Sequence, residues 1–302
     1  MAKRVFNVWR GNIEGGDFKQ FEIEVDPGMV VLDVLHRIQA QQANDLALRW
    51  NCKAGKCGSC SMEINGKPRL ACMTRMNVFS ETETITCQPL KTFPVMKDLV
   101  TDVSWNYEQN KRIPKFKPRP RDADGTYRMY QEDVDRVQEF RKCIECYLCQ
   151  DVCHVLRDRD KPAINAPRVT DPRSPAVRTE TAAGARGDGK SFVGPRFMIR
   201  LASLEMHPLD TDDRIPELKK EFGSGMCNIT RCCTEVCPEH IGITDNGIIP
   251  LKERVVDRYY DPIAIVGRKL LGIRRRTKTR AEEGGAGAPA APAGATRDKG
   301  PA

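Results

Sequence analysis

The sequence predicts an α+β protein in two parts, a small sheet folded over one helix followed by a region built of helices. Three observations predict it. The first hundred residues alternate strand patterns with one helical pattern, the apolar spacing beyond residue 130 is helical, and 302 residues suit two domains of about 150 residues each. A mean hydropathy of −0.51 and the lack of an 18-residue apolar run argue against a membrane span, and the pattern of the first residues leads us to expect no export signal.

The first part is predicted to begin with strands. Residues 20–25 alternate polar and apolar side chains, and Asp-Pro-Gly at 26–28 ends that run as a turn. Apolar residues at helical spacing over 31–38 predict one helix, and 62–70 predict a hairpin around an Asn-Gly pair. A last strand is predicted near 84–90. The order strand, strand, helix, loop, hairpin, strand favours a small sheet over one helix.

The second part is predicted to contain helices at residues 131–141, 195–206, 215–222 and 250–258. The later cysteine groups lie between these helices. Residues 157–194 break the pattern, because they are rich in Pro, Arg, Asp and Gly and hold hardly any periodic apolar residues. We expect a mobile surface insertion there.

Two basic stretches carry most of the net charge of +8. Residues 111–121 hold six basic residues and three prolines, which favours an interdomain linker. Residues 274–302 hold seven basic residues against three acidic ones and become a Gly-Ala-Pro tail. Neither stretch has the interleaved aromatic residues of a nucleic-acid platform. The predicted organisation is therefore a domain at 1–107, a helical domain at 108–274 and a disordered tail at 275–302.

The thirteen cysteines lie in close groups, a spacing typical of metal ligands in a reducing compartment rather than of secreted disulfide frameworks. The first group has the C-x4-C-x2-C…C spacing of plant-type [2Fe-2S] ferredoxins. Its members are Cys52, Cys57, Cys60 and Cys72. Gly55 and Gly58 would allow positive φ angles that turn the loop amides toward a cluster. Zinc is the alternative metal for any set of four thiolates. It tolerates many spacings, so this particular spacing favours the [2Fe-2S] cluster.

The second group, at residues 143–153, has the C-x2-C-x2-C-x3-C spacing of bacterial ferredoxins. The fourth cysteine of such a run ligates the other cluster in two-cluster ferredoxins, so a second copy is needed. Residues 227–237 supply it, with Thr230 in place of the middle cysteine. This exchange assigns a [4Fe-4S] cluster to Cys143, Cys146, Cys149 and Cys237. It assigns the second cluster, expected to be [3Fe-4S] because only three thiolates remain, to Cys153, Cys227 and Cys233.

Three further residues near these groups need an interpretation. Cys87 lies in a strand without a partner at ligand spacing, and we expect a buried free cysteine. Cys232 adjoins Cys233, and one of the two must point away; matching the first run selects Cys233 as the ligand. His154 follows Cys153 and could donate a hydrogen bond to a sulfide, lie near an electron acceptor, or simply pack.

Over nearly its whole length the chain resembles the iron-sulfur subunit of succinate dehydrogenase and fumarate reductase, in an actinobacterial-type branch. The segments that carry the resemblance are Arg-Trp-Asn-Cys-Lys-Ala-Gly-Lys-Cys-Gly-Ser-Cys at 49–60 and Cys-Thr-Glu-Val-Cys-Pro at 233–238. The resemblance implies a β-grasp [2Fe-2S] ferredoxin domain followed by an all-α bacterial-ferredoxin-like domain. It also implies a flavoprotein partner whose FAD oxidises succinate, and a membrane anchor in which quinone is reduced.

The chain departs from the family's usual pattern beside two of the expected ligands. Relatives commonly place proline and nearby tryptophans after the equivalent of Cys153, and histidine after the equivalent of Cys227, where quinone docks. His154 and Asn228 occupy those places here. The departures argue against a direct quinone contact from this chain.

The function implied by the resemblance is electron transfer from the partner's flavin through the [2Fe-2S], [4Fe-4S] and [3Fe-4S] clusters toward quinone. No side chain of this chain needs to act as acid, base or nucleophile. The chain would lie peripherally at the cytoplasmic face of the cell membrane. The alternatives are the iron-sulfur subunit of a fumarate reductase or of another flavoprotein dehydrogenase, a free ferredoxin-like carrier, and a zinc-stapled nucleic-acid binder.

The end of the helical part is predicted to be amphipathic. Ile263, Val266, Leu270 and Ile273 form one stripe of a short helix, with basic residues beside it. Such an end can rest at an anionic membrane surface or against the anchor, and docking to the flavoprotein is the alternative.

Overall fold

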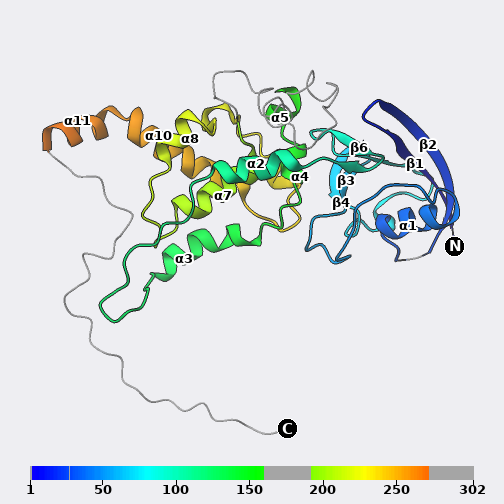
Figure 1. The fold of residues 1–302 in the computed structure, drawn as a ribbon, viewed down its shortest axis with the longest axis horizontal. Helices are drawn as coiled ribbons and strands as arrows, with labels where there is room; N and C mark the ends of the chain where they lie inside the picture. The colour runs from blue at the N-terminus through cyan, green and yellow to red at the C-terminus, as the bar shows by residue number, and fades with distance from the viewer. Residues whose placement is uncertain (1, 27, 160–191, 272–302) are drawn as a thin grey trace, which may run out of the picture.

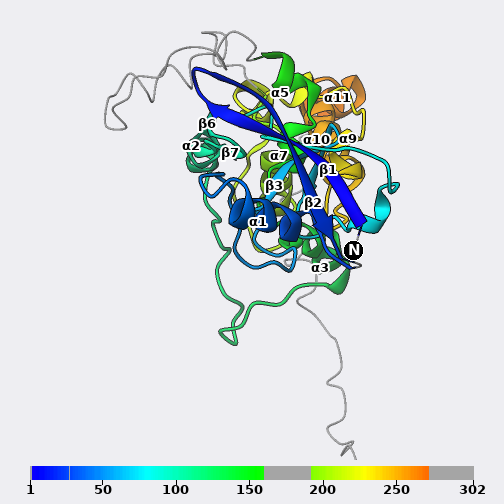
Figure 2. The ribbon, with the colours of Figure 1, turned by 90° about the vertical axis from the view of Figure 1, so that its right-hand side faces the viewer.

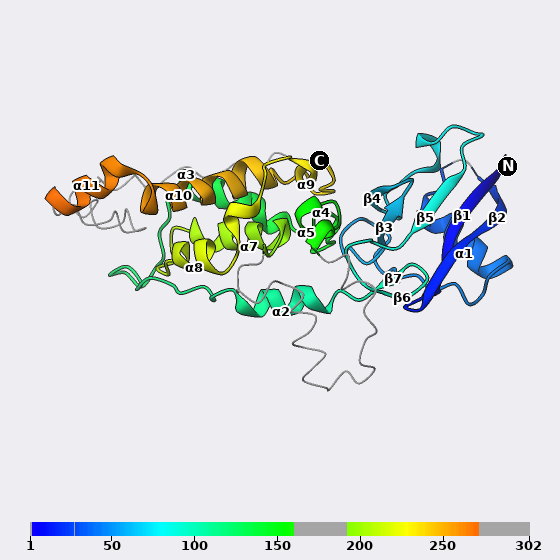
Figure 3. The ribbon, with the colours of Figure 1, turned by 90° about the horizontal axis from the view of Figure 1, so that it is seen from above.

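The computed structural model describes residues 2–26, 28–159 and 192–271. The strands and α1 gather at one end of an elongated molecule and most of the other helices at the opposite end, as Figures 1 and 3 show from two directions. This arrangement agrees with the predicted α+β class, in which a mixed sheet precedes the helices.

The sheet has seven strands among the described residues, in the order β4-β3-β5-β1-β6-β7 with β2 paired to β1. Its strands are β1 (Ala2–Asn12), β2 (Gly15–Val25), β3 (Ser61–Ile64), β4 (Lys67–Leu70), β5 (Ile85–Gln88), β6 (Val95–Lys97) and β7 (Val100–Thr101). β1 and β2 form a long antiparallel hairpin, whereas β1 and β5 pair in parallel. The helix α1 (Val31–Gln41) lies beside β2 and buries an apolar face of five residues against the core (Figure 2).

The sequence patterns missed three features of this part. The predicted strand at 20–25 is the second half of β2; the first half shows no pattern, because its first six residues are all exposed. The short β6–β7 hairpin carries little pattern at all. The helix α2 (Ser104–Arg112) buries the polar residues Asn106 and Gln109 instead of an apolar stripe, so hydrophobic periodicity gives no signal. α2 crosses the expected domain boundary at 107 and takes in the first residues of the expected linker.

The helical part contains the four predicted helices. They are α3 (Gln131–Gln138) continued by η2 (Glu139–Lys142), α7 (Pro195–Glu205), α8 (Ile215–Lys220) and α10 (Ile249–Tyr259). The other described elements are η1 (Met76–Val78) in the first part, and α4 (Leu148–Asp151), α5 (His154–Arg159), η3 (Ser224–Met226), α9 (Cys232–Glu235), the π-helical η4 (Ile243–Ile248) and α11 (Pro262–Leu271). α7 lies at the centre of this core and packs against η4 and η2.

The two parts share contacts around α4. Tyr147 and Leu148 belong to the hydrophobic core of the sheet domain although they lie in the second cysteine run. The Thr92 amide donates a hydrogen bond to Asp151 Oδ1 at 3.0 Å, and Arg157 of α5 pairs with the buried Glu63 of β3. The first and second cysteine groups are thereby held at one interdomain junction.

Both ends of the expected insertion at 157–194 are part of the fold. Arg157 makes the interdomain ion pair, and Phe192 and Val193 are fully buried in the helical core. These two apolar residues directly follow a polar segment and are too few to show a periodicity, so the sequence pattern does not separate them from it. The interior of that segment and the predicted tail lie outside the described residues.

Candidate iron-sulfur sites

The loop that carries the first cysteine group has the backbone shape expected of its glycines. Gly55 and Gly58 have φ angles of +69° and +68°, which confirms the expected left-handed conformation. A Cβ at Gly58 would lie 2.7 Å from Cα of Cys146, so this glycine also permits a close approach to the second cysteine run. Ser61 Oγ lies 2.9 Å from the carbonyl oxygen of Cys146 at the same contact.

Backbone amides of the first group point at its sulfur atoms. The amides of Ala54 and Lys56 donate to Cys52 Sγ at 3.4 and 3.3 Å, and the amide of Cys72 donates to Cys60 Sγ at 3.4 Å. Cys60 and Cys72 are buried whereas Cys52 is exposed. Such hydrogen bonds stabilise thiolates, which are the form that ligates iron.

The thiols of the first group differ in acidity. Burial opposes ionisation of Cys57, but hydrogen bonds from Ser59 and from the Cys52 amide outweigh it and lower the pKa of Cys57 to about 6. Burial raises the pKa of Cys60 to about 12. A metal must displace the proton from such a thiol, so binding at this group releases protons and strengthens with pH.

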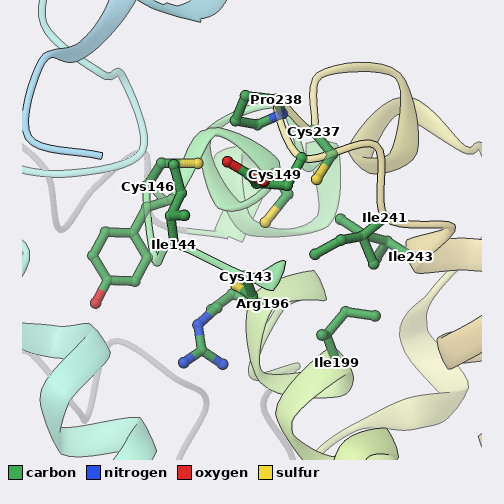
Figure 4. A pocket seen from close by; sticks show the side chains of 12 residues that line it. Cys143, Ile144, Cys146, Cys149, Arg196, Ile199, Cys237, Pro238, Ile241 and Ile243 are labelled. Carbon is green, nitrogen blue, oxygen red and sulfur yellow. The ribbon is translucent and has the colours of Figure 1, made fainter. Parts of the chain in front are cut away.

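The second cysteine site is a cavity, called the second cavity below, that is lined by four cysteine side chains from two distant segments of the chain. Figure 4 shows them around a common space, with Ile199, Ile241 and Ile243 on its apolar walls. The four are Cys143, Cys146, Cys149 and Cys237. Burial raises the pKa of Cys149, and the neighbouring sulfurs of Cys146 and Cys143 add to the effect. Four thiols in an apolar cavity match the ligand chemistry of an iron-sulfur cluster.

One basic side chain lines this second cavity. Arg196, near the start of α7, is only 7% exposed and forms an ion pair with Glu145. Burial opposes its charge, but the neighbouring Cys143 and Glu145 raise the pKa of Arg196 above its ordinary value. No sequence signal pointed to this residue, because it lies outside both cysteine runs.

A third cavity is lined by the three remaining cysteines of the expected exchange, Cys153, Cys227 and Cys233. Thr230 and Cys232 line it as well, and Thr230 Oγ1 lies 3.3 Å from Cys232 Sγ. Matching the two cysteine runs predicted that Cys232 points away, whereas the structure places this residue at the cavity. His154 and Asn228 also contribute, with His154 Nε2 3.1 Å from Asn228 Nδ2.

The second and third cavities are built from two copies of one backbone motif. Glu145 and Tyr147 in the first copy have φ angles of +55° and +61°, and Ile229 and Arg231 at the corresponding positions of the second have +59° and +64°. A short helix follows each pair, α4 in one copy and α9 in the other. In this alignment Thr230 corresponds to Cys146, and Cys232 corresponds to the buried Leu148.

Cys87 takes no part in these cavities. It is fully buried in β5 and forms no disulfide, as expected from its sequence context. Burial raises the pKa of its thiol to about 12.

Comparisons with known proteins agree with this geometry. A family model described as a 2Fe-2S iron-sulfur cluster binding domain matches residues 5–108, and a 4Fe-4S dicluster domain model matches residues 139–241. The fumarate reductase iron-sulfur subunit of Mycobacterium tuberculosis is 34% identical over 242 residues, which cover 77% of this chain and 84% of that protein. The succinate dehydrogenase iron-sulfur subunit of Bacillus subtilis is 27% identical over 242 residues, 75% of this chain and 81% of that protein.

A solved structure resembles this chain at a higher sequence identity than these two relatives do. A chain of the Mycobacterium smegmatis Sdh1 complex superposes with a TM-score of 0.75 at 56% sequence identity, covering 87% of this chain and 99% of that one. An iron-sulfur protein of Methanococcus maripaludis, 29% identical over 266 residues or 85% of this chain, is longer, and this chain spans 45% of it.

The fold and the cysteine cavities define an iron-sulfur electron-transfer protein with a 2Fe-2S domain and a 4Fe-4S dicluster domain. More narrowly, the chain belongs to the family of iron-sulfur subunits of succinate dehydrogenase and fumarate reductase. Its function is electron transfer through iron-sulfur clusters.

Proposed function

We propose that this chain relays electrons in a succinate dehydrogenase, from the FAD of a flavoprotein partner toward quinone in a membrane anchor. When bound, the clusters would accept and pass on single electrons in the order [2Fe-2S], [4Fe-4S] and [3Fe-4S]. The chain itself would hold the three cysteine sites close together and provide the charges and apolar groups that surround each cluster.

The observation that carries this proposal is the continuous row formed by the three cysteine sites. Gly58 of the first group packs against Cys146 of the second. The second and third cavities are joined by the short segments that run from Cys149 to Cys153 and from Cys233 to Cys237. Each segment contributes one cysteine to each cavity, so the second and third sites share two short stretches of backbone.

The first proposed ligand set follows the sequence spacing of its loop, and the other two follow the cavities. Cys52, Cys57, Cys60 and Cys72 would hold the [2Fe-2S] cluster. Cys143, Cys146, Cys149 and Cys237 would hold the [4Fe-4S] cluster. Cys153, Cys227 and Cys233 would hold the [3Fe-4S] cluster, because Thr230 offers no thiolate at the corresponding position. Cys232 competes for that open position, since it lines the same cavity.

Membrane association in this proposal depends on partners. No helix in the described part of the chain is long and apolar enough to cross a membrane. The chain would lie peripherally at the cytoplasmic face, held by the flavoprotein and the anchor. At the end of the described helices, Ile263 and Val266 of α11 are exposed on one side, which supports a contact with the anchor or the membrane surface.

A fumarate reductase is the second candidate, favoured by the Mycobacterium tuberculosis relative of that name. Purification of the complex from its native membrane tests both functions against a free carrier, and the ratio of its succinate:quinone to its quinol:fumarate activity separates the two. The main proposal expects a flavoprotein and an anchor to co-purify, and succinate to reduce the clusters in the absence of any added carrier. Isolation of the chain alone, with clusters that succinate cannot reduce in the complete membrane, would contradict it.

A further inference from the structure

Arg196 occupies a position that is unfavourable for a cation unless negative charge lies beside it. It is in the first turn of α7, where the helix dipole favours acidic residues. Its side chain is 7% exposed, so its charge has lost most of its hydration. Apart from Tyr147 and from Glu239, whose carboxylate pairs with Lys56 of the first cysteine group at 2.9 Å, the wall that it shares with four cysteines is apolar (Figure 4).

The guanidinium is only partly satisfied by its protein neighbours. One Nη atom pairs with the carboxylate of Glu145, which is itself 48% exposed. The Nε atom is buried without a hydrogen-bond partner among the described residues. The guanidinium carbon lies 5.5 Å from the centre of the Phe197 ring, a contact that a cation accepts. The buried positive charge therefore lies between a solvated carboxylate and a cavity lined with sulfur.

We propose that Arg196 is a tuning residue that raises the reduction potential of the cluster held in the second cavity, and that Glu145 partly offsets this effect. The inference rests on the proposed ligand set for that cavity. Adding an electron makes a thiolate-bound cluster more negative, so a nearby buried cation stabilises the reduced form. The effect is strong here because the apolar walls screen charges poorly. Glu145 opposes it less, because water screens its half-exposed carboxylate.

The test is a redox titration of the purified complex, followed by the paramagnetic signal of the reduced [4Fe-4S] cluster. Arg196→Gln should lower the equilibrium constant for reduction about tenfold, a shift of about 59 mV for a one-electron couple. Glu145→Gln should shift the potential the other way by a smaller amount. Arg196→Lys should have a reduction potential close to that of the wild type, because lysine keeps the positive charge. Opposite signs from two neutralising variants separate a charge effect from distortion of the site, which has no reason to follow the sign of the charge removed.

Two results would overturn the inference. The first is an Arg196→Gln potential equal to that of the wild type. The second is a shift of the same sign in Arg196→Gln and Glu145→Gln. If Arg196→Gln does not assemble, the other two variants decide the question. The inference then expects a potential above that of the wild type in Glu145→Gln and a nearly wild-type potential in Arg196→Lys, and a lowered potential in Glu145→Gln would contradict it. A wild-type complex without a [4Fe-4S] signal would instead overturn the proposed ligand set and this inference with it.

Discussion

Gly58→Ala should damage the junction between the first two cysteine groups more than any other glycine substitution in the first domain's turns. Gly58 has a φ of +68°, which costs an L-residue about 1–2 kcal/mol. The added methyl would lie 2.7 Å from Cα and 3.0 Å from the amide nitrogen of Cys146, and backbone cannot move aside cheaply. Overpacking of this kind adds about 1–3 kcal/mol. The expected destabilisation is therefore about 2–5 kcal/mol.

The matched control is Gly66→Ala in the β3–β4 turn. Gly66 has a similar φ of +72°, but nothing lies within 4 Å of its added methyl, so only the backbone cost of about 1–2 kcal/mol applies. Gly55→Ala is a second control, because the methyl there meets the flexible side chain of Met73. The assay is bleaching of iron-sulfur absorbance in the purified complex as urea is raised. A Gly58→Ala midpoint no lower than that of Gly66→Ala would refute the close approach to Cys146.

The remaining predictions concern the third cavity, a buried thiol and the last helix. Thr230→Cys should supply a fourth thiolate, so that the paramagnetic signal of oxidised [3Fe-4S] is lost, iron content rises, and quinone reduction slows more than dye reduction at the flavin. Absence of that signal from fully loaded wild-type protein would contradict the assignment and point to Cys232 or His154 as the fourth ligand. Because Cys87 is fully buried and burial raises the pKa of its thiol to about 12, iodoacetamide should modify Cys87 only after unfolding. Mass spectrometry checks this, and labelling of the native protein would refute it. Truncation after Pro262 removes Ile263, which is 83% exposed, and should weaken membrane attachment without loss of iron; unchanged attachment in a flotation assay would exclude a role for α11.

The spacing of neighbouring residues in the sequence was enough to predict much of this protein's iron-sulfur chemistry. The first cysteine group and its two glycines could be recognised as a ferredoxin loop, because a cluster ligated mainly from one loop imposes fixed spacings on that loop. The second copy of the bacterial run could be found despite Thr230, because the geometry of a cube sends the fourth ligand of a run to the other cluster. The four predicted helices likewise appeared where apolar residues follow helical spacing.

Other features depended on contacts that no local pattern records. Glu145 and Ile229 adopt left-handed conformations without being glycine, because the surrounding fold holds them there. α2 forms by burying polar residues, so its sequence does not distinguish it from a linker.

The sequence by itself determined which cysteines could act together, since ligand spacing is a property of neighbouring residues. Only the tertiary structure decided what surrounds them. In the structure, Leu148 packs in the hydrophobic core of the sheet domain, and Gly58 lies against Cys146. The structure also places Arg196 in the wall of the second cavity and Cys232 at the third. Each of these is a contact between segments far apart in the chain, set by how two cores pack together, and periodicity within one segment holds no information about the other.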